Sequence, residues 1–194
     1  MVMEIGVLAL QGDFAEHVTT IQRLGIQARE VRLPEHLEGI QGLIIPGGES
    51  TTIGKLATDF GLIEPLIAFG MQHAIWGTCA GAIFISRDAI RQQPLLGLMD
   101  IQVERNAFGR QIDSFEVDLE VPCLKEVDDS DSPFHAIFIR APIISSVFGR
   151  SKILASLPDG RIVAARQDRL LATSFHPELT HDDRFHRYFV EMAK

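Results

Sequence analysis

The sequence predicts an α/β fold in three layers, in which helices cover both faces of a mostly parallel central sheet that continues into an antiparallel extension. Short apolar runs alternate with segments of helical periodicity in the first half of the chain, as in sheets whose parallel strands are joined by helices. Strand-like alternation without intervening helices follows from residue 98. Polar clusters directly follow three of the apolar runs, at the sheet edge where such folds bind ligands.

The first half is predicted as strands and helices in alternation. An apolar run ends at the polar turn Gln11-Gly12-Asp13, after which apolar residues recur at helical spacing as far as Gly25, and Pro34 ends the next strand. The predicted strands are 5–10, 27–33, 42–45 and 74–76, and the predicted helices are 14–24, 51–57, 62–69 and a segment through 83–85.

The second half is predicted to extend the sheet with antiparallel strands. Strand-like runs occur within 98–121 and at 137–140, 146–148, 153–157 and 162–165. The acidic stretch 128–133 is expected to be a solvated surface loop. A last strand is predicted at 170–175, and an amphipathic helix from about 181 to 192 closes the chain. No repeat or linker divides the sequence, so one domain is expected over residues 1–194.

Composition restricts the class of protein. With 194 residues, 46% of them hydrophobic, the chain is long enough for one buried core. Its net charge of −8 argues against a nucleic-acid or anionic membrane partner, so a small-molecule ligand is expected. Two cysteines provide no disulfide framework, which suits a reducing cytosol. Neither a signal peptide nor an apolar run long enough to span a membrane is evident, so we expect a cytoplasmic protein.

The stretch Gly77-Thr78-Cys79-Ala80-Gly81 has the pattern of a nucleophile elbow, Gly-x-nucleophile-x-Gly between a strand and a helix. In such a turn the central residue is held in strained backbone geometry above the sheet, and a Cβ on either glycine would collide with the neighbouring strand or helix. At a helix N-terminus the thiolate form of Cys79 is favoured, which suits acyl transfer. A buried, inert core cysteine is the alternative.

His176 is the candidate base for this thiol, because an imidazole can both take up and return a proton near neutral pH. Glu178 lies two residues further along and could fix the imidazole tautomer, with the stiff Pro177 between them. A histidine after a strand can equally be a hydrogen-bonded structural residue. The remaining histidines, in or beside predicted helices and loops, are weaker candidates: His17, His36, His73, His135, His181 and His186.

Acyl transfer also requires donors for an oxyanion, each worth on the order of 3 kcal/mol. The N–H of Ala80, directly after the nucleophile, is one candidate, and the Gly47-Gly48 pair after the strand 42–45 is the other. A plain glycine turn is the alternative for that pair. The following residues lack the Gly-x-x-x-x-Gly-Lys-Ser/Thr pattern of a phosphate loop, and no group of residues has metal-ligand spacing.

These motifs resemble those of the triad (class I) glutamine amidotransferases and, within them, the glutaminase subunits of pyridoxal 5'-phosphate synthases. The resemblance covers essentially the whole chain from Gly6 onward. The elbow and His-Pro-Glu are shared by the wider superfamily, whereas Glu-Arg-Asn-x-Phe-Gly-Arg-Gln and Ile-Arg-Ala-Pro are the narrower markers. The stretches that carry it are 46–52 (Pro-Gly-Gly-Glu-Ser-Thr-Thr), 77–81, 103–111 (Val-Glu-Arg-Asn-Ala-Phe-Gly-Arg-Gln), 138–142 (Phe-Ile-Arg-Ala-Pro) and 174–179 (Ser-Phe-His-Pro-Glu-Leu).

The resemblance implies a flavodoxin-like three-layer sandwich that hydrolyses L-glutamine to L-glutamate and ammonia through a glutamyl thioester, with no cofactor or metal. It implies that Cys79, His176 and Glu178 form the triad. The implied glutamine-binding residues are Gly47, Gly48, Glu49, Ser50, Arg105, Ile139 and Arg140. A guanidinium suits the substrate carboxylate and Glu49 suits its ammonium, although a surface ion pair is the alternative for the two arginines.

The resemblance also implies a partner, a TIM-barrel synthase subunit that receives the ammonia in an assembly with twelve copies of each subunit. Two other interpretations stay open at this point. The chain could be a glutaminase for another acceptor, such as imidazole glycerol phosphate synthase, or a cysteine hydrolase or sensor of the same fold.

Overall fold

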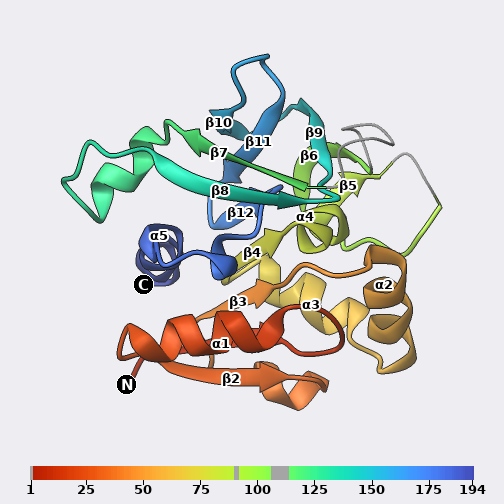
Figure 1. Cartoon of the computed structure of the whole chain (residues 1–194). Coiled ribbons are helices and arrows are strands. Elements are labelled where there is room, and N and C mark those ends of the chain that lie inside the picture. Colours follow the sequence, from red (N-terminus) through yellow and green to blue (C-terminus); the bar gives the residue numbers. More distant parts are fainter. Residues whose placement is uncertain (1, 90–91, 106–113) are drawn as a thin grey trace.

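The computed structural model describes residues 2–89, 92–105 and 114–194. Its elements alternate between strands and helices up to α4, after which strands predominate (Figure 1). The strands are β1 (Glu4–Leu8), β2 (Gln27–Val31), β3 (Gly42–Ile45), β4 (Ala74–Thr78), β5 (Ser86–Asp88), β6 (Met99–Glu104), β7 (Ser114–Leu119), β8 (Phe134–Ile139), β9 (Ile143–Val147), β10 (Lys152–Ser156), β11 (Ile162–Gln167) and β12 (Leu170–Thr173). The α-helices are α1 (Phe14–Arg23), α2 (Ser50–Asp59), α3 (Ile63–Gly70), α4 (Ala80–Ile85) and α5 (Arg184–Ala193), and the 3₁₀ turns are η1 (Pro34–Leu37), η2 (Pro122–Glu126) and η3 (Pro177–Leu179).

Within the described residues the central sheet has ten strands, in the order β2-β1-β3-β4-β12-β11-β9-β6-β5 with β10 paired to β11. Neighbours from β2 to β12 are parallel, whereas β11 pairs with β12, β9 and β10 in antiparallel fashion and β9 is antiparallel to β6. The predicted α/β class, with a mostly parallel sheet and an antiparallel extension, is confirmed.

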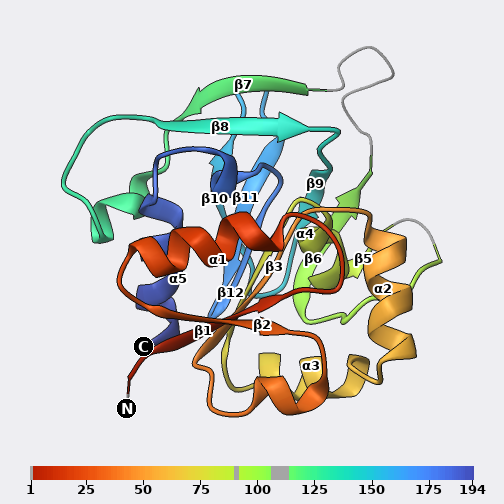
Figure 2. The same cartoon turned by 60° about the horizontal axis from the view of Figure 1, so that its bottom comes forward.

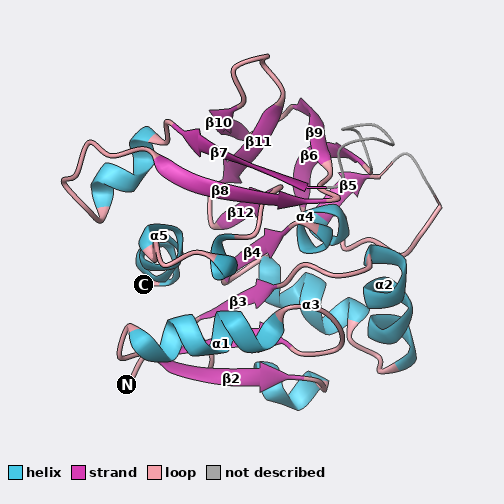
Figure 3. Ribbon diagram, viewed as in Figure 1, coloured by secondary structure: helices cyan, strands magenta, loops and turns pink. Residues whose placement is uncertain are grey.

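Helices cover both faces of this sheet because side chains alternate along each strand. In β3, Leu43 and Ile45 face the core beneath α2, α3 and α4, whereas Ile44 faces the core beneath α1 and α5. In β4, Ile75 and Trp76 divide in the same way. Figure 3 shows the strands running between these two groups of helices.

The prediction that 98–121 extends the main sheet is wrong for its second half. Strand β6 joins the sheet, but β7 pairs with β8 in a separate two-stranded sheet that crosses one end of the molecule (Figures 1 and 2). Its buried face carries Leu119, Phe134 and Phe138 onto the core beneath α1 and α5, while its other face is exposed. Apolar and polar residues alternate both in a strand of a half-exposed sheet and in a hairpin that packs one face onto a sheet. The sequence pattern therefore does not separate the two arrangements.

Other boundaries differ by a few residues. The final strand ends at Thr173, so Phe175 lies in the following loop, and the terminal helix begins at Arg184. The acidic loop after η2 is largely exposed, as expected, and Arg184 donates to the carbonyls of Ser132 and Pro133 at 2.8 and 2.9 Å. None of the described helices is long and apolar enough to span a membrane.

Candidate functional site

The polar clusters predicted at the carboxyl ends of the strands meet at one cavity. Strands β4 and β12 are parallel neighbours in which Thr78 pairs with Thr173, so the chain leaves both strands at the same level. Cys79 follows one strand, and His176 lies three residues beyond the other. The cavity has a volume of about 520 Å³ and is lined by Gln11, Gly12, Asp13, Gly48, Glu49, Ser50, Cys79, Ala80, Ile83, Arg105, Ile139, Arg140, Pro142, His176 and Leu179.

Cys79 occupies a strained turn between β4 and α4. Its φ of 48° and ψ of −106° lie outside the regions that most residues adopt, and its N–H donates to the Thr173 carbonyl at 2.8 Å. A Cβ at Gly77 would lie 2.5 Å from the Gly81 carbonyl, and one at Gly81 would lie 1.9 Å from the Ile45 oxygen. Both glycines of the elbow are therefore required by packing, against the helix and against β3 respectively.

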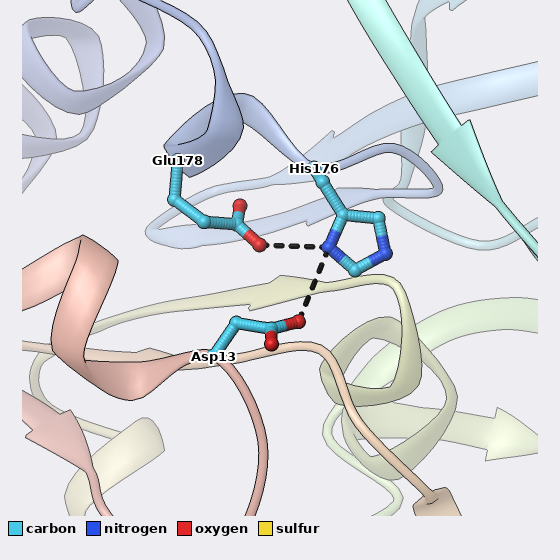
Figure 4. A group of neighbouring side chains, drawn as sticks. All are labelled: Asp13, His176 and Glu178. Carbon is cyan, nitrogen blue, oxygen red and sulfur yellow. Dashed lines mark hydrogen bonds and ion pairs between the residues drawn. The ribbon is translucent and has the colours of Figure 1, made fainter.

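His176 is oriented by two carboxylates (Figure 4). Its Nδ1 lies 2.7 Å from Glu178 Oε1 and 3.5 Å from Asp13 Oδ2. The Glu178 side chain is fully buried, whereas that of Asp13 is 43% exposed. Glu178 is therefore the stronger partner, because water screens the longer and more exposed contact.

The electrostatics of the site keep the His176 ring protonated. Burial lowers the pKa of His176, but hydrogen bonds and charge from Cys79 and Glu178 outweigh burial and raise this pKa to about 10. Burial raises the pKa of Glu178, and the hydrogen bond and charge of His176 oppose that rise. The base candidate thus interacts with the thiol as well as with the carboxylate.

Main-chain contacts fix the loop that carries His176. The N–H of His176 donates to the Ile137 carbonyl of β8 at 2.8 Å, which ties the loop to the two-stranded sheet. A Cβ on Gly47 would lie 2.5 Å from His176 Cε1, so only glycine lets the 46–48 turn approach the ring so closely. Gly47 and Glu178 do not line the cavity; both lie behind His176.

Glu49 and Arg105 form an ion pair at the cavity wall, with Arg105 Nη2 2.7 Å from Glu49 Oε1. The other Glu49 oxygen caps α2, accepting from the Thr52 N–H at 2.7 Å. Burial raises the Glu49 pKa, but the hydrogen bonds from Thr51 and Thr52 together outweigh it and lower this pKa to about 2. Glu49 is thus ionised at neutral pH, and its expected contact with a substrate ammonium stays a prediction.

The other predicted binding residues also lie at this cavity. Ser50, the first residue of α2, is buried and its hydroxyl donates to Gln93 Oε1 at 3.3 Å. Ile139 and Arg140 end β8, and Arg140 has a positive φ of 44°, uncommon for a residue with a side chain. Residues 106–111 of the motif that begins at Val103 lie outside the described residues.

The two oxyanion candidates occupy different backbone environments. Ala80 is the first residue of α4, and the leading N–H groups of a helix have no carbonyl partner one turn earlier. Gly48 has a φ of 147°, and a Cβ there would lie 2.5 Å from Gln11 Oε1. The preceding carbonyl, that of Gly47, accepts from the Asp13 N–H at 3.3 Å, which sets the direction of the Gly47-Gly48 peptide.

The loop after β1 contributes to the cavity and was not predicted as part of the site. Gln11, Gly12 and Asp13 line the cavity, and Gln11 Oε1 accepts from the Glu49 N–H at 2.8 Å. The signal was present, because these residues follow a parallel strand just as the other three clusters do. Pro142 and Leu179 also line the cavity. Nothing in the sequence marked them as site residues apart from the family motifs that contain them.

Among the described residues, Asp13, His176 and Glu178 are a group with metal-ligand atoms within 4.8 Å of one another. The nitrogen nearest the two carboxylates is His176 Nδ1, and a protonated Nδ1 donates to Glu178 at 2.7 Å. A cation at this position would have to replace that proton. The arrangement therefore fits a His176 imidazole oriented by the Glu178 carboxylate better than it fits a metal centre.

Comparison with known proteins gives a consistent result. The model of the SNO glutamine amidotransferase family matches residues 7–194. The chain is 58% identical to the pyridoxal 5'-phosphate synthase subunit PdxT of Herpetosiphon aurantiacus, covering 97% of this chain and 99% of that protein. It is 55% identical to the protein of the same name from Moorella thermoacetica, covering 98% and 99%. A crystal structure of a glutamine amidotransferase, 50% identical, superposes with a TM-score of 0.89 over 97% of this chain and 98% of that one.

Proposed function

The chain belongs to the SNO glutamine amidotransferase family, and from that membership we propose that it is the glutaminase subunit of a pyridoxal 5'-phosphate synthase. It hydrolyses the side-chain amide of L-glutamine to L-glutamate and ammonia. The observation that carries the proposal is that Cys79 and His176, 97 residues apart in the sequence, line one cavity, while Glu178 contacts His176 from behind at 2.7 Å. The full-length identity to PdxT proteins favours this synthase over another ammonia acceptor.

In the proposed reaction the Cys79 sulfur attacks the amide carbon of glutamine. The tetrahedral intermediate collapses when His176 gives its proton to the departing nitrogen, so that ammonia leaves and a glutamyl thioester remains. Water then attacks the thioester while His176 takes the water proton, and glutamate leaves as the thiolate re-forms. A His176 pKa near 10 suits the first step, because the imidazolium that must donate is populated at neutral pH.

The cavity supplies complementary groups for the rest of the substrate. The N–H groups of Ala80 and Gly48 are proposed to donate to the oxyanion. Glu49 is proposed to hold the substrate ammonium, and Arg105 or Arg140 its carboxylate, with Ser50 and Ile139 shaping the pocket and Gly47 supporting it from behind His176. The ion pair between Arg105 and Glu49 at 2.7 Å supports these roles, since it presents both charges at one wall.

The ammonia requires an acceptor protein, because ammonia released into water is protonated and lost as a nucleophile. The proposed acceptor is the synthase subunit, a TIM barrel, in an assembly with twelve copies of each subunit. The exposed Ile139 and Leu179 at the cavity rim support a contact on this face, since both side chains are about 40% exposed.

Intact-mass measurement after treatment with a glutamine-like electrophile tests the nucleophile. We expect one adduct on the wild type, none on Cys79→Ala and one on Cys123→Ala, because burial raises the pKa of the Cys123 thiol and leaves it unreactive. An equal adduct on Cys79→Ala would exclude the proposal. Ammonia release from glutamine, assayed with and without the synthase subunit, tests the reaction itself.

A further inference from the structure

Two buried histidines lie directly behind the carboxylate of Glu178. His17 of α1 and His186 of α5 are both fully buried, and neither lines the cavity. His17 Nε2 lies 3.3 Å from Glu178 Oε2, the oxygen that does not contact His176. The same nitrogen lies 3.3 Å from Thr78 Oγ1, at the end of the strand that carries the elbow.

The contacts of this pair determine where its protons lie. His17 Nδ1 is 3.0 Å from His186 Nε2, so one of the two nitrogens must donate. His186 Nδ1 is buried without a hydrogen-bond partner among the described residues. A buried N–H without an acceptor is costly, so the His186 proton belongs on Nε2, where it donates to His17. His17 Nδ1 is then the acceptor, and the His17 proton lies on Nε2, facing Glu178 and Thr78.

The environment keeps both rings neutral. Burial, followed by the charges of His186 and His176, lowers the pKa of His17, and burial lowers the pKa of His186 to about 3. Trp76 packs edge-on against both rings, with centroid distances of 5.7 and 5.0 Å. Each ring therefore presents a fixed dipole, with no charge that would compete with His176 for the carboxylate.

We propose that His17 is a positioning residue for glutamine hydrolysis: its Nε2–H, anchored at Thr78, attracts the second oxygen of Glu178 through its dipole, while His186 fixes the His17 tautomer. This inference rests on the proposed function. The hydrogen bond of His17 Nε2 is with Thr78 Oγ1, and Glu178 Oε2 has no hydrogen bond among the described residues. The 3.3 Å contact between His17 Nε2 and Glu178 Oε2 is therefore electrostatic, between the N–H dipole and the carboxylate. Held at this oxygen, the carboxylate keeps Oε1 directed at His176 Nδ1.

Nitrogen NMR of the ¹⁵N-histidine-labelled full chain tests the proton positions without any activity. We expect His17 and His186 both to carry their proton on Nε2 and to stay neutral from about pH 6 to 9, as two deeply buried imidazoles should. A His17 ring protonated on Nδ1 would overturn the inference. Because this readout does not depend on turnover, it separates a failure of the inference from a failure of the proposed function.

Kinetics with the synthase subunit present test the consequence. His17→Phe keeps a ring but removes the donor, and we expect kcat to fall about tenfold with KM nearly unchanged. His17→Gln places an amide N–H about as far along the side chain as Nε2 and should recover most of that loss. Ile21→Val, a buried change one turn further along α1, is the matched control and should keep the wild-type kcat.

Two kinetic results would contradict the inference. One is a folded His17→Gln that loses as much kcat as His17→Phe, and the other is a His17→Phe with the wild-type kcat. Circular dichroism of each variant records whether it folds. A wild type without glutaminase activity would reject the proposed function instead.

Discussion

At the scale of single residues, His176 has two carboxylate neighbours that differ in burial. Glu178 Oε1 contacts Nδ1 at 2.7 Å from a fully buried side chain, whereas Asp13 Oδ2 is at 3.5 Å and substantially exposed. A buried charge acts through less water than an exposed one, so its effect on the ring is larger. We therefore expect Glu178 to orient His176 and Asp13 to contribute less.

Replacing each carboxylate by its amide should separate the two roles. Glu178→Gln removes the charge that steadies the imidazolium, and we expect kcat to fall by about 10³ or more, as when a triad acid is changed to its amide. Asp13→Asn should cost less than about tenfold, because its contact is long and screened. Steady-state ammonia release with the synthase subunit measures both. Equal losses in the two variants would contradict the assignment.

The raised pKa of His176 also predicts how stability depends on pH. Since the folded pKa of about 10 lies above the unfolded value of 6.5, protonation of His176 favours the folded state. Its contribution is fully present below pH 6.5 and is lost as pH rises through 10. The difference in urea midpoint between the wild type and His176→Gln should therefore shrink from pH 6.5 to pH 10. A difference in urea midpoint that stays constant from pH 6.5 to pH 10 would contradict the raised pKa of His176.

At the scale of elements, the β4–α4 turn is possible only because the two glycines around Cys79 lack a Cβ. Gly81 packs against β3, where an added Cβ would lie 1.9 Å from a backbone oxygen that cannot move alone. Gly70, at the end of α3, is also a helical glycine, but a Cβ there would meet the flexible end of Leu98 at 2.6 Å. The backbone oxygen beside Gly81 cannot move alone, whereas the Leu98 side chain beside Gly70 can change its conformation.

Alanine at these positions should therefore have very different effects. Gly81→Ala should destabilise the fold by about 3 kcal/mol or more, since α4 or β3 must shift to relieve the overlap. Gly70→Ala should change stability by less than about 1 kcal/mol, because the Leu98 side chain can change rotamer and alanine favours a helix. Urea unfolding followed by circular dichroism measures both. Similar costs at the two positions would show that the contact at Ile45 is not what requires glycine.

At the scale of the whole molecule, the site is assembled by the order of strands in the sheet. The last strand, β12, inserts beside β4, so the loop that carries His176 reaches the elbow. The two-stranded sheet then holds this loop through the Ile137 carbonyl and brings Ile139 and Arg140 to the cavity rim. A partner bound at this rim would contact the loops that carry the proposed catalytic residues.

Docking of the synthase subunit is therefore expected to raise glutaminase turnover. The Gly47-Gly48 peptide is held by a long hydrogen bond, 3.3 Å from the Asp13 N–H to the Gly47 oxygen, which costs little to break if the peptide must turn its N–H toward the oxyanion. We expect kcat to rise at least about tenfold on adding the synthase, the gain for one oxyanion donor. Ammonia release over a titration of the synthase measures this, and unchanged turnover would refute it.

Several features of the protein could be predicted from the sequence because they depend on local pattern. The elbow was predictable because a strand, two flanking glycines and a helix lie within a few residues, and His176 and Glu178 because they follow a strand in such a sheet. The resemblance to glutaminase subunits of pyridoxal 5'-phosphate synthases could be recognised from the Glu-Arg-Asn-x-Phe-Gly-Arg-Gln and Ile-Arg-Ala-Pro stretches. The position of β7 was not predictable, because its alternation would fit either sheet.

The α/β class, the elbow at Cys79 and the set of loops at one sheet edge could be predicted from the amino-acid sequence, since strand and helix periodicity and turn glycines are local properties. Which side chains meet depends instead on how the chain packs in three dimensions. This packing brings Asp13 to His176, pairs Arg105 with Glu49, and places His17 and His186 behind Glu178. These contacts depend on the order and register of strands far apart in the chain, which periodicity does not encode.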